Sequence, residues 1–470
     1  MIKFFNTFSR KKEEFAPLVD GNVGLYTCGP TVYNFVHIGN LRTYIFEDIL
    51  ERVLKYNDFK VRRVMNITDV GHLTSDADEG EDKLDRQAKA EKQDPLKIAE
   101  RYTQAFLDDC KKLNIKIPEI LEPATKHIDE QKTIIEKLFK KGLAYETSKA
   151  VYFDVSKFPD YGKLSGQSLD EKITAAREEV VTDSEKRNAP DFALWFKRVG
   201  RFENHILHWP SPWGEGFPGW HIECSAISTK FLGQPFDIHT GGVDHIGTHH
   251  TNEIAQSEAA VGKPLANVWM HGEFLLVDNA KMSKSSGNFY TMKDIAERNI
   301  NPLAFRYLVL GAHYRSKLNF TWEALGAAQN GINNLYHSYL GIHGAAPSKL
   351  NDSLGTKEAI AAEAEFKNAL NDDLNTPQAL AVMWEVVKSS ELSAGDKRAL
   401  LSSFDEVLGL DIEKFAAQYV IPQEVKDLVA KREKCRQNQQ FAQADALRLK
   451  IETLGYSVED TPSGPRISSR

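Results

Sequence analysis

The pattern of hydrophobic and polar positions near the N-terminus predicts a strand, a turn and an amphipathic helix. Residues 23–27 form a short apolar run, and from Leu41 onward the apolar side chains of Leu41, Ile45, Ile49 and Val53 recur every four positions. A second β-rich run follows at residues 60–67. Strand-helix-strand units of this kind build parallel sheets, and nucleotides bind at the carboxyl ends of their strands.

The pattern then changes twice along the chain. A helical stretch at about 95–143 and an irregular polar stretch to about 204 precede further strands at 236–239 and 268–277. After residue 291 the periodicity is helical nearly to the end, broken by a polar linker of small residues at 341–355. We therefore predict an α/β protein with a parallel sheet split by an insertion and a mostly α-helical C-terminal half.

Composition narrows the class of protein. With 470 residues, 41% of them hydrophobic, the chain can fill the cores of about three domains. No apolar run approaches the roughly 20 residues of a membrane span, so we expect a cytoplasmic protein. Four widely spaced cysteines favour reduced thiols over a disulfide framework. A net charge of -7 argues against binding nucleic acid with the whole surface.

Two short motifs suit phosphate chemistry. His37-Ile38-Gly39-Asn40 stands at the predicted strand-to-helix turn, where Gly39 allows close approach to the backbone and the helix N-terminus favours anions. Lys281-Met282-Ser283-Lys284-Ser285 places two lysines on one loop, where they can neutralise a triphosphate. Alone, each motif could be a turn histidine or a solvated charge cluster. Their occurrence together on one α/β chain is much harder to obtain by chance.

Candidate metal ligands are scattered more widely. Cys28, Cys224 and Glu253 are types of side chain that bind zinc, as are the adjacent His249 and His250. On a helix, either histidine can share a face with Glu253. The residues alone do not choose between the two histidines, and two buried thiols beside a surface histidine cluster remain the alternative.

The two phosphate motifs resemble the signatures of class I aminoacyl-tRNA synthetases, which activate an amino acid with ATP and transfer it to tRNA. Those enzymes usually have a second histidine where this chain has Asn40. An amide can donate a hydrogen bond to a phosphate, but it cannot become cationic.

Four further segments resemble cysteinyl-tRNA synthetases in particular. They are Cys28-Gly-Pro, G-W-H-I-E-C-S-A at 219–226, G-G-V-D at 241–244 and N-E-I-A-Q-S at 252–257. The resemblance covers essentially the whole chain and implies one Zn²⁺ held by Cys28, Cys224, His249 and Glu253. Zinc prefers a thiolate to a hydroxyl, so it would select cysteine over serine where shape alone discriminates weakly. The resemblance also implies the contacts to substrates: cysteine at Cys28, Thr68 and Trp220, and ATP at His37, Gly39, Asn40, Gly241, Asp244, Lys281 and Lys284.

The implied reaction joins L-cysteine and ATP, with Mg²⁺, into cysteinyl-adenylate and then transfers cysteine to the 3'-terminal adenosine of tRNA(Cys). His37, Asn40, Lys281 and Lys284 would be the catalytic residues, and we expect a monomer. One alternative is a mycothiol-type cysteine ligase, which resembles a synthetase shortened at its C-terminus. The other is a non-catalytic tRNA-binding relative.

The resemblance also implies a split Rossmann-type parallel-sheet catalytic domain and a C-terminal tRNA-binding half, and it divides the chain into expected domains. The catalytic halves would occupy 1–95 and 206–285, on either side of an insertion at 96–205. A stem-contact region at 286–340, a helical bundle at 341–415 and a small anticodon-binding module at 416–470 would follow. In that module four basic residues are candidate phosphate contacts, although such a cluster also suits a solvated face: Lys431, Arg432, Lys434 and Arg436.

Overall fold

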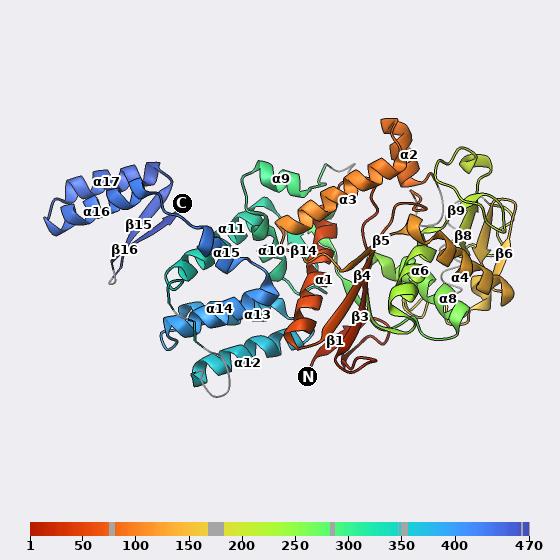
Figure 1. Cartoon of the computed structure of the whole chain (residues 1–470), viewed down its shortest axis with the longest axis horizontal. Helices are drawn as coiled ribbons and strands as arrows, with labels where there is room; N and C mark the ends of the chain where they lie inside the picture. The colour runs from red at the N-terminus through yellow and green to blue at the C-terminus, as the bar shows by residue number, and fades with distance from the viewer. Residues whose placement is uncertain are drawn as a thin grey trace.

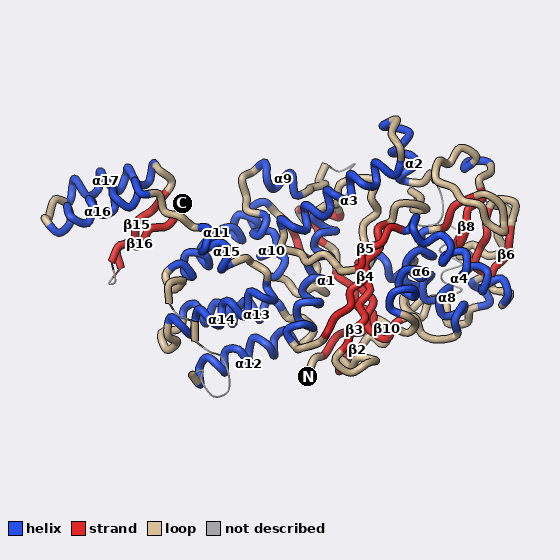
Figure 2. Tube along the Cα trace, in the orientation of Figure 1, coloured by secondary structure: helices blue, strands red, loops and turns tan. Residues whose placement is uncertain are grey.

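The structure is a computed structural model that describes residues 1–74, 80–167, 183–282, 287–345, 347–348, 356–461 and 464–469. Figure 1 shows the elements spread along one long axis, from an antiparallel sheet through a parallel sheet and a helical bundle to a small module at the far end. Figure 2 shows strands and helices mixed in one half of the molecule and mostly helices in the other. None of the described helices combines the length and the apolar composition that a bilayer span needs.

A five-stranded parallel sheet forms the centre of the N-terminal half, which confirms the predicted fold class. Its first two strands lie where the apolar runs at 23–27 and 60–67 predict them, and two others come from beyond residue 235. Across the sheet the strands are β11 (Ala266–Gly272), β10 (Phe236–Gly242), β3 (Asn22–Thr27), β4 (Lys60–Ile67) and β5 (Ile120–Pro123).

Helices cover both faces of this sheet. Leu25 of β3 belongs to the core cluster that contains the apolar side chains of α1 (Ile38–Tyr56), whereas Tyr26 belongs to the cluster of α6 (Trp220–Leu232). Because successive strand residues point to opposite faces, α1 and α6 lie on opposite sides. Two more helices follow β10: α7 (Asp244–Gly247) and α8 (His249–Val261), the second of which packs against α6.

The insertion begins later than the sequence pattern predicts. Helix α2 (Lys83–Glu91) and helix α3 (Pro95–Lys112) lead into β5, which pairs with β4 in the parallel sheet. The expected boundary at residue 96 falls at the start of α3, although β5 after it belongs to the parallel sheet. A four-residue strand is too short to interrupt a helical pattern in the sequence. The insertion proper contains α4 (Ile128–Lys140) and an antiparallel sheet of β6 (Ala144–Glu146), β7 (Ala150–Phe153), β8 (Phe192–Lys197) and β9 (Gly216–Pro218).

Two small sheets lie next to the parallel sheet. Near the N-terminus, β1 (Lys3–Asn6) pairs with β2 (Lys11–Glu14). The strand predicted at 268–277 is in fact two strands, because Arg42 Nη1 donates to the carbonyl oxygens of Glu273 and Phe274. Beyond this break, β12 (Leu275–Val277) pairs with β13 (Ala280–Lys281) and with β14 (Leu318–Phe320).

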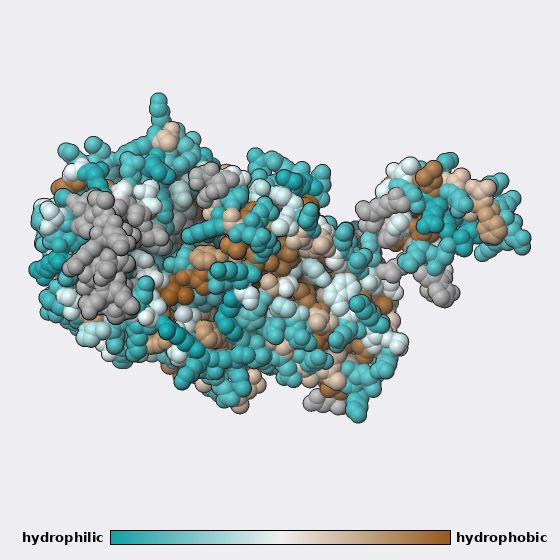
Figure 3. All heavy atoms as spheres, turned by 180° about the vertical axis from the view of Figure 1, so that it is seen from behind, coloured by the Kyte–Doolittle hydropathy of each residue, from teal (hydrophilic) through white to brown (hydrophobic). Residues whose placement is uncertain are grey.

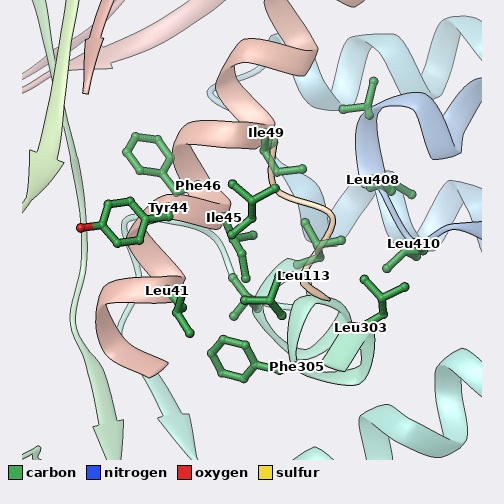
Figure 4. Close-up of a cluster of buried hydrophobic side chains, with 14 of the residues drawn as sticks. Leu41, Tyr44, Ile45, Phe46, Ile49, Leu113, Leu303, Phe305, Leu408 and Leu410 are labelled. Atoms are coloured by element: carbon green, nitrogen blue, oxygen red, sulfur yellow. The ribbon is translucent and has the colours of Figure 1, made fainter. Parts of the chain in front are cut away.

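The C-terminal half is mostly helical, as predicted. It contains α9 (Met292–Glu297), α10 (Pro302–Leu310), α11 (Trp322–Leu340), α12 (Lys357–Asn371), α13 (Thr376–Lys388), α14 (Ala394–Leu408) and α15 (Ile412–Gln418). Most of the linker predicted at 341–355 lies outside the described residues. Figure 4 shows side chains of α1, among them Ile45, packed against Leu303 and Phe305 of α10 and near Leu408 and Leu410. One continuous core therefore joins the parallel sheet to the bundle.

The last segment folds around a small core of its own. Helix α16 (Gln423–Gln437) and helix α17 (Phe441–Thr453) pack with the hairpin of β15 (Tyr456–Thr461) and β16 (Gly464–Ser469), which the helical pattern does not predict. From behind, this module projects away from the rest of the molecule (Figure 3). Arg432 is buried and donates to both carboxylate oxygens of Asp460, at 2.7 and 3.0 Å, so it is not the phosphate contact that the sequence suggested. Lys431 and Lys434 are exposed.

Candidate active site

A cavity of about 280 Å³ opens where strands β3, β4 and β10 end. This is the edge at which parallel α/β sheets bind ligands. Residues from before and after the insertion line it. Nine of them are site residues predicted from the sequence: Cys28, His37, Asn40, Thr68, Trp220, Cys224, Gly241, Asp244 and His249. Gly39, Glu253 and Lys281 lie outside this lining, and Lys284 lies outside the described residues.

Four candidate metal ligands converge beside this cavity. The ligand atoms of Cys28, Cys224, His249 and Glu253 all lie within 4.8 Å of one another, and all four side chains are buried. Cys28 follows β3, Cys224 lies on α6, and His249 and Glu253 are one turn apart on α8. The fold thus brings together residues from three separate segments.

The geometry of Glu253 fits a shared cation. Its Oε1 lies 2.7 Å from His249 Nε2, yet this oxygen accepts no hydrogen bond from the described residues. Two ligand atoms that are close but not hydrogen-bonded to each other can both face a common ion. Two sulfurs, one imidazole nitrogen and one carboxylate oxygen form a set that suits tetrahedral Zn²⁺.

A second set of buried side chains shares two of these residues. Cys28 and Glu253 also lie within 4.8 Å of His239 and His250. His250, however, has both ring nitrogens engaged, with Cys28 Sγ at 3.3 Å and His271 Nε2 at 2.8 Å. His239 Nε2 bonds Glu253 Oε2 at 2.9 Å. These contacts suit residues that orient metal ligands, and they favour His249 over His250 as the ligand itself.

Neighbouring charges and burial shift the pKa values of three residues in the cluster, in different directions. Burial opposes the charged form of Glu253, but His239 and His249 outweigh it and lower its pKa to about 2. Burial acts against protonation of His249 as well, but Glu253 and Cys28 raise its pKa to about 10. Burial and the neighbouring His239 lower the pKa of His250 to about 4. A divalent cation would take the place of the proton on His249.

Trp220 and Thr68 form the wall of the cavity next to this cluster. The indole of Trp220 lies between two imidazoles, with ring centroids 3.9 Å from His72 and 4.2 Å from His249. The Thr68 hydroxyl donates to Glu223 Oε1, and Asn66 Nδ2 donates to the same carboxylate oxygen at 3.0 Å. Burial raises the pKa of Glu223 well above its usual value.

His37 and Asn40 cap the helix that carries them. His37 is the residue before α1; its Nδ1 accepts from the backbone N–H of Asn40 at 3.2 Å, while Asn40 Oδ1 accepts from the backbone N–H of His37 at 3.2 Å. The Asn40 carbonyl oxygen is thus directed at the backbone. Asn40 is therefore part of a reciprocal helix cap, a role that the predicted phosphate contact does not include.

Residues next to the lysine motif contact the motif that contains His37 and Asn40. Phe289 packs edge-on against His37 with ring centroids 5.1 Å apart, and the backbone N–H of Ile38 donates to Tyr290 O at 2.9 Å. A Cβ on Gly39 would lie 2.9 Å from the His37 ring and 3.1 Å from Met282 Cε, so glycine makes this close packing possible. Lys281 is exposed, with its Nζ 5.4 Å from the centre of the Phe274 ring.

Gly241 and Asp244 lie at the end of β10, on the other side of the cavity. A Cβ on Gly241 would lie 2.6 Å from His245 Nδ1 and 2.7 Å from His250 Cε1. Glycine is needed there to admit two imidazoles, in addition to any approach of a ligand to the backbone. Asp244 is exposed at the start of α7, so its carboxylate is accessible from the cavity.

The capping geometry of Asn40 gives a first prediction. If the chain catalyses the reaction that the sequence resemblance implies, we expect Asn40→His to retain cysteine-dependent pyrophosphate exchange within about tenfold, because one hydrogen bond contributes about 1 kcal/mol and an imidazole can also accept from the backbone. Steady-state exchange kinetics on both proteins measure the effect. Complete loss of activity, with unchanged circular dichroism, would show that the site requires the amide.

Comparison with known proteins identifies the family. The model described as "tRNA synthetases class I (C) catalytic domain" matches residues 14–330. The DALR domain matches 365–413, and the cysteinyl-tRNA ligase anticodon binding domain matches 420–465. Cysteine–tRNA ligase 1 of Burkholderia lata is 48% identical over 468 residues, which are 99% of this chain and 96% of the relative. This chain belongs to the cysteine–tRNA ligase family.

Other relatives agree with this membership. A cysteine–tRNA ligase of Thermus thermophilus is 42% identical over 481 residues, covering 99% of this chain and 98% of the relative. Solved class I synthetases share the fold at low identity. Methionyl-tRNA synthetase of Mycobacterium tuberculosis, bound to methionyl-adenylate, gives a TM-score of 0.55 at 16% identity over 84% of this chain and 90% of its own. Agrobacterium radiobacter LeuRS gives 0.61 at 12% identity over 86% of each chain.

Proposed function

We propose that the cavity activates L-cysteine with ATP to cysteinyl-adenylate, and that the chain then transfers cysteine to tRNA(Cys). The observation that carries this proposal is the cluster of Cys28, Cys224, His249 and Glu253 beside a cavity that His37 also lines. Membership of the cysteine–tRNA ligase family supports the same reaction. The match of residues 420–465 to an anticodon binding domain favours a tRNA ligase over a mycothiol-type cysteine ligase.

Cys28, Cys224, His249 and Glu253 would hold one Zn²⁺. When bound, zinc supplies a position for the substrate thiolate, which it prefers to the hydroxyl of serine. His239 and His250 orient Glu253 and Cys28 through the hydrogen bonds described above. Trp220 and Thr68 enclose the remainder of the amino acid, so its carboxylate faces the part of the cavity that His37 lines.

His37 and Asn40 would bind the phosphates of ATP at the N-terminus of α1, where the helix dipole favours anions. Lys281 and Lys284 would approach the same phosphates from the loop that carries Met282, with Mg²⁺ accompanying the nucleotide. The substrate carboxylate attacks the α-phosphorus, and pyrophosphate leaves. Gly241 and Asp244 would lie beside the adenosine, where a carboxylate can accept from a ribose hydroxyl.

We further propose that the C-terminal half binds the tRNA. The terminal module, residues 423–469, would contact the anticodon with its exposed Lys431 and Lys434, and residues 286–340 would contact the stem. The catalytic unit would comprise 1–123 together with 219–285, which adjusts the division predicted from the sequence.

Aminoacylation with and without metal tests the proposed function. We expect the zinc-loaded protein to charge bulk tRNA with cysteine and to reject serine by at least about 10³-fold, because shape alone supplies only about 10–200-fold for one small group. Removing zinc with a strong chelator should abolish cysteine charging, and added Zn²⁺ should restore it. Equal charging with serine, or full activity without metal, would contradict the assigned role of the cluster.

A further inference from the structure

Phe35 is an exposed aromatic residue on the lining of the cavity, and the functions assigned so far leave it without a role. It is 52% exposed and lies in the segment between β3 and α1. Of the phenylalanines that the structure describes, only Phe441 is exposed to a similar extent, and it lies on the terminal module. A single exposed apolar side chain is common on a protein surface, but the ring of Phe35 is accessible to whatever enters the cavity.

Side chains of α3 support the ring of Phe35 from one side. Tyr102, which is buried, packs against it edge to face, with ring centroids 5.1 Å apart and ring planes at 88°. The guanidinium carbon of Arg101 lies 4.6 Å from the centre of the Tyr102 ring, and Arg101 Nη2 donates to both carboxylate oxygens of Glu91, at 2.8 and 2.9 Å. An edge-to-face pair leaves at least one face of the Phe35 ring outside the contact. The ring is therefore held in place and still presents an open face.

In the proposed reaction the site must hold two adenosines when cysteine passes to the tRNA. One belongs to cysteinyl-adenylate, and Gly241 and Asp244 at the end of β10 would lie beside it. The other is the terminal nucleoside of the tRNA, whose ribose supplies the hydroxyl that accepts cysteine. In the sheet, β10 lies on one side of β3, whereas Phe35 packs against α3, which leads into β5 on the other side of β3. Phe35 is therefore placed for the second adenosine and not for the first.

We propose that Phe35 stacks with the adenine of the 3'-terminal adenosine of the tRNA during transfer. Aromatic side chains bind single-stranded ends of nucleic acids in this way, because every base has a flat aromatic face. A base held there leaves its ribose hydroxyl free to attack the acyl carbon of cysteinyl-adenylate. The new ester bond forms as the bond between the acyl carbon and the phosphate oxygen breaks; AMP leaves with the electron pair, and the hydroxyl proton passes to a phosphate oxygen of AMP. This inference rests on the proposed transfer of cysteine to tRNA(Cys).

Two assays on the zinc-loaded protein separate the steps and test the proposal. Cysteine-dependent pyrophosphate exchange needs no tRNA, whereas single-turnover transfer from preformed cysteinyl-adenylate measures the second step alone. We expect Phe35→Ala to retain exchange and to slow transfer at subsaturating tRNA about tenfold or more, because stacking on one aromatic side chain strengthens binding by about 5–150-fold per base. Phe35→Tyr keeps an aromatic face and should retain transfer. Phe35→Leu is apolar but has no such face, and it should lose transfer as Phe35→Ala does.

Leu18→Ala is the matched control, because Leu18 is an apolar residue of similar exposure, 47%, that does not line the cavity. A direct probe is tRNA(Cys) with 2-aminopurine in place of the terminal adenine, since the fluorescence of 2-aminopurine reports stacking. We expect the wild-type protein and Phe35→Tyr to quench this fluorescence, and Phe35→Ala to leave it unchanged. Unchanged transfer by Phe35→Ala or Phe35→Leu, or equal loss of exchange and transfer, overturns the proposal. A wild-type protein that transfers no cysteine to tRNA would instead refute the proposed function.

Discussion

Cys224→Ser is expected to abolish tight zinc binding and to lower cysteine-dependent pyrophosphate exchange by more than about 100-fold. Even residues that only orient a metal ligand change metal affinity or activity by about 10–100-fold, and Cys224 would be a ligand itself. A serine hydroxyl is not ionised at neutral pH and is a poor ligand for zinc. Zinc content measured by atomic absorption, together with exchange kinetics, checks both parts.

A second buried cysteine provides the control for this variant. Cys110 is 1% exposed and belongs to the core of α3, outside the metal cluster, so Cys110→Ser also introduces a buried hydroxyl. We expect Cys110→Ser to reduce stability but to retain zinc and exchange activity. Full cysteine-dependent exchange by metal-free Cys224→Ser would remove zinc from the mechanism.

Local patterns predicted the centre of the fold because they depend on neighbouring residues alone. The apolar run before Cys28 and the four-residue spacing from Leu41 coincide with β3 and α1. The short strand β5 and the terminal hairpin were not predicted, because their pairing partners decide their structure. The break after Gly272 likewise depends on Arg42, which lies far away in the sequence.

The sequence predicted some residues of the candidate site and missed others. Family motifs indicated the four candidate metal ligands that the fold brings together. Spacing alone did not show that these residues bind a metal, nor which of the two adjacent histidines is the ligand. His239 and His271, which contact the candidate ligands or their neighbours, were missed because a single histidine in a strand carries no signal until the tertiary contacts are known. Capping by Asn40 was not predicted, because the histidine usual at this position indicates phosphate binding rather than a helix cap.

Helix α1 shows most clearly what periodicity cannot predict. Its apolar spacing suggests one buried face and one solvated face, yet its charged residues Glu47, Asp48, Glu51 and Arg52 are buried as well. The helical bundle covers the face that would otherwise meet water. Charges enclosed in this way must be paired, and Asp48 is at the centre of the pairing.

Asp48 joins three parts of the chain through two buried guanidinium groups. Its Oδ2 accepts from Arg52 Nε at 2.8 Å and from Arg306 Nη2 at 2.6 Å, while Oδ1 accepts from the backbone N–H of Lys116 at 2.8 Å. Arg306 in turn donates to the carbonyl oxygens of Leu408 and Leu113. Burial opposes the charge on Asp48, but Arg306 and Arg52 outweigh it and lower its pKa.

We expect Asp48→Asn to lower the free energy of unfolding by about 3–5 kcal/mol, because it leaves two buried guanidinium groups without their carboxylate. Asp372→Asn is the matched control: Asp372 is 55% exposed and pairs with Lys12 at 2.7 Å, and an exposed pair contributes about 0–1 kcal/mol. Urea titrations followed by circular dichroism compare the two variants. Equal unfolding midpoints would mean that the network contributes nothing to holding α1 against the bundle. A large loss of stability confined to Asp48→Asn would show that α1, which carries Asn40, is anchored by Arg306 of the helical half.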